Sequence, residues 1–490
     1  MRPSTLVRHL LLLSAAFAAL LCGLITGASA QTSAYDPFRE EAQNMRLVGY
    51  NDLQGRSAYQ PVIQQQGNRW IAYIGHHAGR AQNPLAGREE GNGTSIVDVT
   101  DPANPRYIAH IPGGDGDEDT EAQMVRTCSG NDLPDGVNGI YYLLRALGAN
   151  GHEIWDVTTP EQPTLVSSME EEGLRDTHKN WWECDTGIAY LVSGVEGWAS
   201  RRMTQVYDLS DPAEPRFIRN FGLPGQQPGG SEHDEMGNYE LHGPIAVGNR
   251  IYFGYGTFLN GVIQIVDREK LLRGNPAIED PFEPTNENLT YPVITTMYTG
   301  PRLGAHTAFP VLGIDVPEFA ENSEGRTRDM LLVVGESLRN ECLENRQMMY
   351  MVDITDETRP WPVGNFQVPE ESGGFCERGG RFGTHSSNEN MTPIYYKSVV
   401  FLAYFNGGVR AVDIRDPWAP KEIGHYIPPI TEATTQRCIN VEGVEQCKTA
   451  IQTNNLDVDD RGYVYAVDRA NTGLHIVELT GSAREVANFQ

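Results

Sequence analysis

A short motif recurs along most of this 490-residue chain. Its clearest copies read GTSIVDVTDPANP at Gly93–Pro105, QVYDLSDPAEP at Gln205–Pro215 and RAVDIRDPWAP at Arg410–Pro420. Each copy places a short aliphatic run before an acidic residue. The seven acids are Asp98, Asp156, Asp208, Asp267, Asp353, Asp413 and Glu478. A repeat of this regularity limits the chain to a fold built from similar, successive units.

Each copy predicts the same local structure. The aliphatic run predicts a short strand that is buried on both faces. The Asp-Pro pair of the clearest copies favours a tight turn, because Asp bonds its own backbone and Pro presets φ. A further strand follows the turn, as at Arg106–Ile111 and Arg216–Phe221.

The spacing of the copies predicts the architecture. Successive acids are 52 to 86 residues apart, which leaves room for four short strands and their loops. Four-stranded sheets repeated around an axis form a β-propeller. We therefore predict an all-β, seven-bladed β-propeller with four-stranded antiparallel blades. The alternative is an array of β-sandwiches, which show less regular repeats.

The two ends of the repeat region complement each other. Met45–Gln54 reads like the outermost strand of the other units, and no repeat precedes it. The last copy, at His475–Leu479, has no outermost strand of its own. We predict that the N-terminal strand, Met45–Asn51, pairs with His475–Leu479 and closes the last blade, because closure removes exposed sheet edges.

The pattern (I/V)VD-x-(T/S)-DP-x-x-P resembles the LVIVD repeat of exported β-propeller proteins. The resemblance covers most of residues 46–480. It implies a propeller fold and an extracellular or periplasmic location, and it implies little about function. The fourth and seventh copies depart from the pattern, because Asp267 is followed by Arg-Glu-Lys and Glu478 replaces the Asp.

The N-terminus has the composition of a secretory signal peptide. Arg2 and Arg8 precede an apolar run at Leu10–Ile25, and Ala28–Ala30 offers a small-residue cleavage site. An uncleaved membrane anchor is the alternative, but the apolar run is short of a span. The predicted domains are a signal peptide at 1–30, a flexible segment at 31–44 and the propeller at 45–490.

The charge of the chain limits its partners. The net charge is −27, and removal of the predicted signal peptide takes away two arginines and makes it more negative. An acidic protein of this kind is repelled by nucleic acids and by anionic membrane surfaces. We therefore expect no nucleic-acid partner and no membrane insertion, and a periplasmic or extracellular protein.

Six cysteines follow the predicted cleavage site. An even count in an exported protein predicts disulfides. Cys438 and Cys447 bracket a short insertion, Cys342 and Cys376 lie in long loops, and Cys128 and Cys184 lie at matching depth in neighbouring units. We predict these three pairs. The alternative is buried free thiols or metal ligands, although no C-x-x-C spacing occurs.

Four histidines occupy one equivalent position at the start of the innermost strand of four consecutive units. They are His178, His242, His306 and His385. The other three units carry the amides Gln60, Gln123, and Asn454 with Asn455. Inner strands converge on the propeller axis, so the four imidazoles are expected to bind one transition metal, Fe, Cu, Zn or Mn. The alternative is four separate histidines bonded to backbone around a water-filled channel.

The second strand of each unit ends at the same mouth. Its last residues include His76, His77, Arg145, Glu196, Tyr255, Glu336, Asn406 and Arg469. Metal-bound His usually donates its second N–H to a carboxylate or carbonyl, so Glu336 or Glu196 could orient a ligand. Arg145 and Tyr255 complete the predicted catalytic set. A solvated rim is the alternative for each of them. Adjacent strand residues face opposite ways, so at most one of His76 and His77 can join the site.

An acidic loop and the histidines of the outer strands are two further features of the chain. Asp115, Asp117 and Asp119 alternate in a Gly-rich loop that could hold Ca²⁺, although a solvated acidic loop is the simpler interpretation. His110, His152, His425 and His475 lie in outer strands and are expected to be structural.

These features support two classes of function. The first is a metal-dependent enzyme, of the oxidoreductase or oxygenase type or a hydrolase or lyase, which acts on a small organic substrate at the channel mouth. With no protein carboxylate expected among the direct ligands, an open metal position could activate O₂ or water. The second is a non-enzymatic binding or scaffold propeller that uses its loop face for protein or ligand interaction.

Overall fold

The computed structural model describes residues 35–114, 120–148, 151–170, 173–230, 239–256, 260–317 and 325–489. Residues from Pro37 onward belong to one compact unit. The regular elements of this unit are mainly antiparallel strands, as the repeat predicted. The predicted signal peptide lies outside the described residues. No helix in the described part of the chain is both long and apolar enough to span a bilayer.

Five four-stranded antiparallel sheets follow one another along the chain. The first two are β3 (Ala58–Gln66), β4 (Arg69–His76), β7 (Thr94–Asp98) and β8 (Arg106–Ile111), then β9 (Val125–Ser129), β10 (Tyr141–Leu147), β11 (Gly151–Asp156) and β12 (Thr164–Met169). The third and fourth are β13 (Trp181–Trp182), β14 (Ile188–Ser193), β15 (Met203–Asp208) and β16 (Arg216–Phe221), then β17 (Leu241–Val247), β18 (Arg250–Tyr255), β19 (Val262–Asp267) and β20 (Val293–Tyr298). The fifth is β21 (Thr307–Asp315), β22 (Thr327–Val334), β23 (Met349–Asp353) and β24 (Trp361–Phe366).

A nine-stranded sheet completes the set and has two parts. One part is β25 (Phe382–Ser387), β26 (Val399–Phe405), β27 (Val409–Asp413), β28 (Lys421–Ile427) and β1 (Glu41–Gln43). The other is β31 (Thr453–Val458), β32 (Tyr463–Asp468), β33 (Leu474–Leu479) and β2 (Met45–Asn51). A single residue pair, Phe405 with Thr453, joins β26 to β31 and so links the two parts.

The remaining elements are short. They are the hairpins β5 (Arg80–Asn83) with β6 (Arg88–Gly91) and β29 (Gln436–Val441) with β30 (Val444–Thr449), the helices α3 (Arg268–Arg273), α4 (Asn286–Thr290) and α5 (Gly481–Arg484), and the 3₁₀ turns η1 (Leu53–Gly55) and η3 (Glu370–Ser372). Helix α3 explains the departure of the fourth copy from the motif. The Asp267 side chain accepts a hydrogen bond from the Lys270 N–H and caps this helix, where other copies make a turn.

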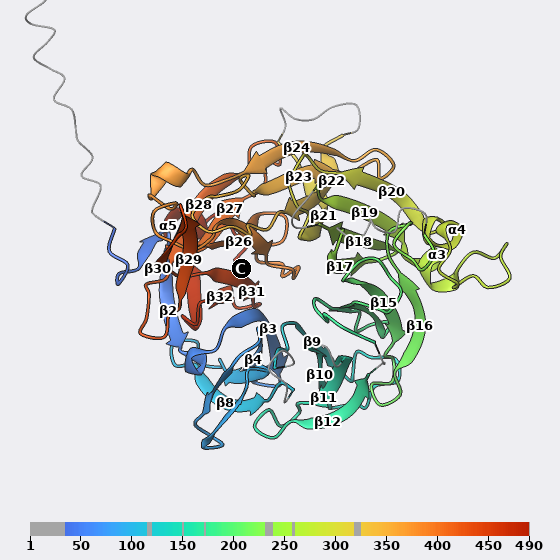
Figure 1. Cartoon of the computed structure of the whole chain (residues 1–490), viewed down its shortest axis with the longest axis horizontal. Helices are drawn as coiled ribbons and strands as arrows, with labels where there is room; N and C mark the ends of the chain where they lie inside the picture. The colour runs from blue at the N-terminus through green and yellow to red at the C-terminus, as the bar shows by residue number, and fades with distance from the viewer. Residues whose placement is uncertain are drawn as a thin grey trace, which may run out of the picture. The chain divides into compact units, whose positions relative to one another are not determined.

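The sheets are arranged in succession around a central axis, with the first strand of each sheet nearest the axis (Figure 1). This is the arrangement of a β-propeller. Neighbouring sheets pack face to face through apolar residues. For example, Ile71 and Tyr73 of β4 form one cluster with Val125 of β9 and Leu143 of β10. The core therefore lies between sheets, and each sheet depends on its two neighbours.

The repeat motif forms the third strand of each group and ends in the predicted turn. The Asp98 carboxylate accepts a hydrogen bond from the Thr100 N–H at 3.0 Å, and Asp413 accepts one from Arg415 at 3.0 Å. A register shift one to two residues before the acid recurs in this strand, for instance between Ile96 and Val97. Such a bulge increases the local twist, which suits strands that fan out from an axis.

The predicted pairing of the N-terminal strand is confirmed. Strand β2 pairs with β33, with Met45 opposite Leu479 and Asn51 opposite Leu474. The segment just before it was predicted to be flexible over residues 31–44. Its end is instead ordered, because Glu41–Gln43 forms β1 and adds to the outer edge of β28. Backbone pairing along an open strand edge holds these polar residues in place.

All three predicted disulfides are present. Cys128 at the end of β9 bonds Cys184, which follows β13 in the neighbouring sheet. The second bond joins Cys342 to Cys376. Cys438 bonds Cys447 across the β29–β30 hairpin. The alternative of free thiols or cysteine metal ligands is therefore excluded for these residues.

Removing β2 tests the closure. A chain that begins at Asp52 leaves β33 with an unpaired edge, and we expect it to aggregate. A chain that begins at Met45 lacks β1 but keeps β2, and it should elute from size exclusion as the longer protein does. Light scattering of the two eluates measures the difference. Equal behaviour of both chains would show that β2 does not protect this edge.

Acid sensitivity tests the role of the outer histidines. Burial is the largest cause that lowers the pKa of His110 and His475 to about 4 and that of His152 to about 3, from an ordinary value of 6.5. Below pH 6.5 the unfolded chain takes up protons that the folded chain does not. The free energy of unfolding should therefore be highest above pH 6.5. It should fall as the pH is lowered toward 4, by up to about 1.4 kcal/mol per pH unit for each histidine.

The variant His475→Phe isolates one of these groups. The His475 ring lies 5.0 Å from the Tyr50 ring and 5.9 Å from the Tyr426 ring, so a phenyl group suits the position. Urea denaturation should show a shallower acid loss for the variant and similar stability at pH 7.5. An unchanged acid slope would contradict the assignment.

Candidate functional site

The residues that face the axis lie at the beginning of the inner strands. His178 lies three residues before β13 and His306 directly precedes β21, whereas His242 lies in β17 and His385 in β25. In β17 the register shifts between Leu241 and Gly243, so His242 stands unpaired in the ladder. A bulge re-aims the side chain of the residue that it frees. Local irregularity of the inner strand thus turns an imidazole toward the axis.

The four histidines are brought together in one continuous cluster. Ring centroids lie 4.8 Å apart for His178 and His242, 4.0 Å for His242 and His306, and 4.4 Å for His306 and His385. All four side chains are buried. The expected convergence is therefore confirmed, whereas metal binding stays a prediction.

Several imidazole nitrogens are free to bind a ligand. His385 Nδ1 lies 2.5 Å from the Asn454 carbonyl oxygen, which can only accept, so Nδ1 carries the proton and Nε2 keeps a lone pair. His306 Nε2, His242 Nδ1 and His178 Nδ1 are buried with no hydrogen-bond partner among the described residues. Buried polar atoms normally have a partner, so this cluster has the donor set of a metal site.

The carboxylate of Glu336 faces the same cluster. Its two oxygens lie 3.7 Å from His242 Nε2 and 3.7 Å from His385 Nε2. Ligand atoms of His242, His306 and Glu336 all lie within 4.8 Å of one another. The sequence predicted Glu336 as an orienting residue and no carboxylate among the direct ligands. The geometry also allows a direct role, because the carboxylate is close enough to be a ligand itself, and the role of Glu336 stays a prediction.

Burial keeps the cluster neutral. It lowers the pKa of all four imidazoles well below 6.5, and nearby arginines lower the pKa of His178, His242 and His385 further. Arg202 is the charged neighbour with the largest effect on the pKa of His178 and His242, and Arg469 has that role for His385. Neutral imidazoles are the form that binds metals.

Sequence reasoning missed Tyr59, which completes the cluster from β3. Its hydroxyl lies 3.1 Å from His178 Nε2, and its ring is 5.1 Å from that of His77. The register of β3 shifts between Ala58 and Gln60, so Tyr59 takes the axis-facing place that was predicted for Gln60. The tyrosine lay beside the predicted position, and only the bulge reveals which of the two turns inward.

The other predicted catalytic residues lie elsewhere. Arg145 is buried and bonds the Glu153 carboxylate at 2.7 Å and the Ile111 carbonyl at 3.1 Å, so it braces two sheets. Tyr255 is buried in an apolar cluster. Glu196 is exposed, and no contact among the described residues brings it to the histidines. Strand ends at the same mouth can point into the core or outward, and the sequence does not fix which.

His76, His77, Asn406 and the acidic loop are the remaining predicted features, and their outcomes differ. Of the adjacent pair, His77 lines the site, whereas His76 Nε2 bonds the Ser95 hydroxyl at 2.8 Å on the other side of the strand. The amide of Asn406 donates to two loop carbonyls and is structural. The calcium loop lies outside the described residues, so Ca²⁺ at Asp115, Asp117 and Asp119 stays a prediction.

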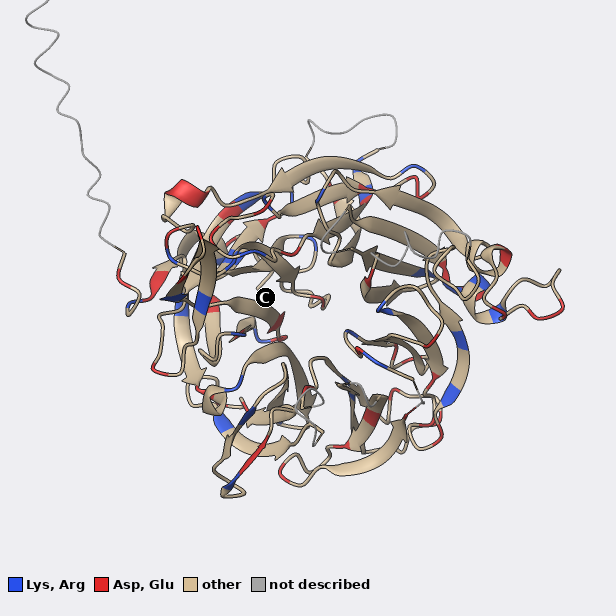
Figure 2. Ribbon diagram, viewed as in Figure 1, with Lys and Arg blue, Asp and Glu red and all other residues tan. Residues whose placement is uncertain are grey.

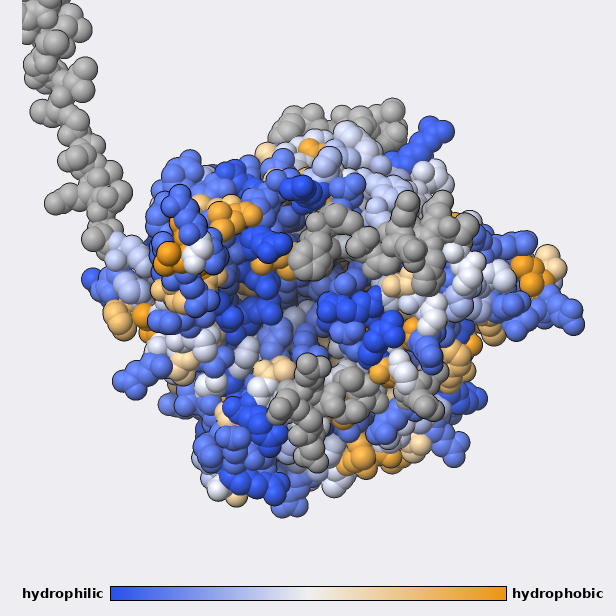
Figure 3. All heavy atoms as spheres, in the orientation of Figure 1, coloured by the Kyte–Doolittle hydropathy of each residue, from blue (hydrophilic) through white to orange (hydrophobic). Residues whose placement is uncertain are grey.

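A small pocket of about 170 Å³ opens beside the cluster. Its polar lining consists of Tyr59, His77, Gln123, His178, Arg201, Arg202, Glu240, His242, Glu336, Arg381, His385 and Arg469. Charged residues of both signs occur on the inner loops of the propeller as well as on the outer strands (Figure 2). The face of the molecule in Figure 3 is hollowed at its centre and has a hydrophilic rim.

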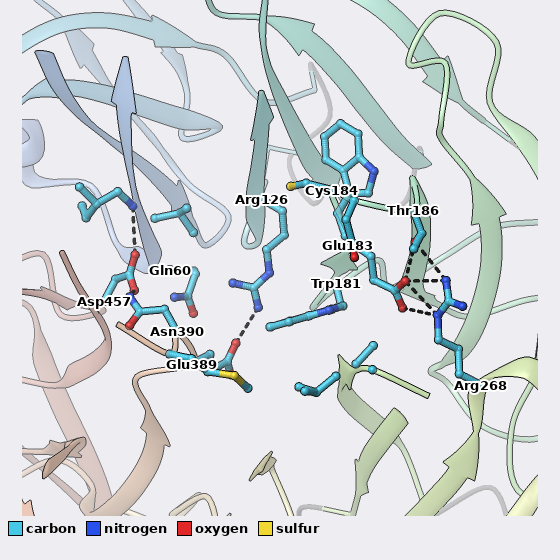
Figure 4. A pocket seen from close by; sticks show the side chains of 18 residues that line it. Gln60, Arg126, Trp181, Glu183, Cys184, Thr186, Arg268, Glu389, Asn390 and Asp457 are labelled. Carbon is cyan, nitrogen blue, oxygen red and sulfur yellow. Dashed lines mark hydrogen bonds and ion pairs between the residues drawn. The ribbon is translucent and has the colours of Figure 1, made fainter. Parts of the chain in front are cut away.

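A second, larger pocket of about 550 Å³ is lined by residues farther along the inner strands. Arg126 lies over the Trp181 ring and bonds Glu389 at 2.6 Å, as Figure 4 shows. Asp457 lies at the opposite wall, and burial is the first cause that raises the pKa of its carboxyl to about 7. The lining of this pocket contains the buried Trp182, the half-buried Trp181 and the ion pair of Arg126 with the buried Glu389, but no histidine.

A chain of polar contacts links the two pockets. The Glu389 carboxylate forms ion pairs with Arg126 and with the ammonium of Lys179. Lys179 Nζ lies 3.4 Å from the Thr307 hydroxyl, which lies 3.1 Å from His306 Nδ1. A hydroxyl oxygen can accept from both Lys179 and His306. Thr307 thus joins His306 Nδ1 to this network, while His306 Nε2 has no hydrogen-bond partner among the described residues.

Comparisons with known proteins concern the fold. No protein-family model matches the chain, and no curated protein matches it by sequence. The solved structures that are similar include Raptor from Chaetomium thermophilum (TM-score 0.49, 11% identity over 91% of this chain), Sqt1 from Saccharomyces cerevisiae (0.44, 10%, 88%) and a Dos1 propeller (0.45, 10%, 89%). The matched regions cover 29%, 98% and 96% of those chains, respectively. The likeness is one of strand arrangement and carries no argument about the site.

The ion pairs of Glu389 with Arg126 and Lys179 predict that a single variant is less stable than a double variant. Glu389→Gln leaves two buried cations without their counter-charge, and we expect a loss of about 3 kcal/mol in the free energy of unfolding. Adding Lys179→Met removes one of those cations and should restore part of the loss. Urea denaturation measures both.

The control is Asp413→Asn, which breaks the exposed ion pair with Arg415. It should cost less than about 1 kcal/mol. A Glu389→Gln variant as stable as this control would contradict the view that Glu389 holds the buried cations.

Proposed function

We propose that this protein is an exported, metal-dependent enzyme that acts on a small organic substrate at the mouth of a propeller channel. The observation that supports this most directly is the cluster itself. Four buried, neutral imidazoles lie in ring-to-ring contact, and a carboxylate faces them. Three of the imidazole nitrogens have no hydrogen-bond partner within the described chain, so they are available as ligands.

The number of blades and the repeat family are part of this proposal. The nine-stranded sheet is held together at the middle by one residue pair, so we count it as two blades. With the five four-stranded sheets this makes seven blades, one for each copy of the motif. We assign the chain to the LVIVD-repeat propellers on the motif alone. Its three disulfides are compatible with an oxidising, periplasmic or extracellular location.

His306 and His385 are the first ligands of this site. His385 has an Nε2 lone pair because its Nδ1 donates to the Asn454 carbonyl, and His306 Nε2 has no hydrogen-bond partner within the described chain. His242 and Glu336 complete the inner group, and His178 flanks it. A transition metal, Fe, Cu, Zn or Mn, would supply Lewis acidity or one-electron chemistry there.

The protein's own groups would prepare the substrate. Tyr59 is held protonated because burial raises its pKa, so its hydroxyl can donate a hydrogen bond beside His178. The side chains around the pocket exclude most water, which strengthens each electrostatic contact inside it. The pocket is smaller than the roughly 300 to 1,000 Å³ of drug-sized sites, so the substrate is small.

Elemental analysis tests the proposal. Purified mature protein should carry about one transition metal ion per chain. His306→Ala should reduce the metal content by at least about tenfold and any turnover with it, while the circular dichroism of the strands is preserved because the core lies between the sheets. The matched control is His425→Ala, since the His425 side chain lies on the outer strand β28 and bonds the Glu422 carboxylate at 2.8 Å.

Absence of metal in the protein, and failure to take it up from solution, would contradict the enzyme proposal. That outcome would favour the non-enzymatic interpretation, in which a binding or scaffold propeller uses its loop face for a protein or ligand partner. Loss of folding in His306→Ala with normal folding of His425→Ala would instead indicate that the cluster is structural.

A further inference from the structure

The pocket beside the histidines has the opposite charge to the protein as a whole. The chain carries −27. Four arginines nevertheless line this pocket, Arg201, Arg202, Arg381 and Arg469, and only two carboxylates, Glu240 and Glu336, accompany them. This excess of arginines needs a reason, because Arg202 is buried and Arg381 and Arg469 are half-buried, and a cation loses hydration on burial.

Two of the four arginines are matched by carboxylates. Arg201 lies 3.0 Å from Glu240 and 3.6 Å from Asp176. Arg381 lies 3.1 Å from Glu336. These pairs account for the negative charge that the lining of the pocket contains.

The other two arginines have incomplete partners. Arg202 is buried, and within the described residues its side chain makes one hydrogen bond, from Nε to the Asp176 carbonyl at 3.3 Å. No carboxylate of the described residues lies within ion-pair distance of it. Arg469 reaches only the far limit of an ion pair, 3.9 Å from a Glu336 oxygen that already serves Arg381. Both guanidiniums therefore keep N–H donors for a ligand.

The two guanidiniums come from different sheets, because Arg202 directly precedes β15 and Arg469 directly follows β32, and both line the pocket together with Tyr59. Arg202 has the largest charge effect on the pKa of His178 and His242, and Arg469 has it on His77 and His385. Burial lowers the pKa of Arg469 to about 10, so this group still carries its charge at neutral pH.

We propose that the pocket binds a small organic anion, a carboxylate or a phosphate, whose charged group lies between Arg202 and Arg469 above the histidine cluster. Guanidinium groups recognise both anions through paired N–H donors. This deepens the proposed function by naming the substrate class, and only the reaction at the cluster rests on that function. The anion site itself rests on the arginines.

The same charges couple the anion to the metal. A cluster flanked by uncompensated arginines repels a divalent cation, and a bound anion removes part of that repulsion. The anion and the metal should therefore raise each other's affinity by the same factor. This coupling explains how cations can stand beside a metal site without preventing its use.

Calorimetric titration with succinate and with inorganic phosphate tests the site on EDTA-treated and on zinc-loaded protein. We expect one of the two anions to bind at one site per chain, more tightly to the zinc-loaded form. Arg202→Gln and Arg469→Gln should each weaken binding about tenfold or more, since a charge-assisted contact is lost. The control Arg415→Gln, at an exposed pair far along the chain, should leave the affinity unchanged.

Which anion binds distinguishes a carboxylate from a phosphate substrate. Binding of neither anion to either form, or equal affinity in the two pocket variants and the control, would overturn the proposal. Should a variant fail to fold, the melting temperature of the unaltered protein decides. If a carboxylate is recognised, succinate must raise the melting temperature and uncharged succinamide must not. If a phosphate is recognised, phosphate must raise it at constant ionic strength. Arginine-dependent binding in a protein that takes up no metal would contradict the proposed function and leave the anion site standing.

Discussion

The convergence of inner strands on one axis is the constraint on which the rest of this structure depends. A strand that starts at the axis has no room to avoid its counterparts, so residues at that one position meet across the channel. Four of them are imidazoles, and their rings lie 4.0 to 4.8 Å apart in sequence around the axis. The outer strands, the disulfides and the β2–β33 pairing hold the sheets in the ring and so maintain this convergence.

The electrostatics of the site follow from that crowding. Water is displaced, so the imidazoles remain neutral, and the charges that surround them act over short distances in a poorly screened medium. Glu336 balances only part of the positive charge of Arg381 and Arg469, while Lys179 is balanced from the other side by Glu389. The imidazoles therefore lie between two groups of charges. On one side are the ion pairs of Glu389, and on the other are Arg202 and Arg469, which lack full counter-charges.

The repeat determined the fold in advance to a large degree. Its aliphatic runs, acids and turns predicted the strands, and its missing outer strand predicted the partner of β2. The cluster of His178, His242, His306 and His385 followed from the same register. The sequence could not show which neighbour of a bulge faces inward, so Gln60 was predicted where Tyr59 stands. Arg145 was misplaced for a related reason, because a strand end fixes a position on a sheet and not the direction of a long side chain.

The central proposal is that His242, His306, His385 and Glu336 hold a single ion, with His178 beside it. Anomalous diffraction from crystals soaked in zinc or manganese, collected at the absorption edge of the metal, tests it most directly. The account predicts one peak on the axis, about 2.0 to 2.3 Å from imidazole nitrogens of His306 and His385. A peak only at surface carboxylates, or an ordered water molecule bonded among neutral imidazoles in place of the ion, would contradict it.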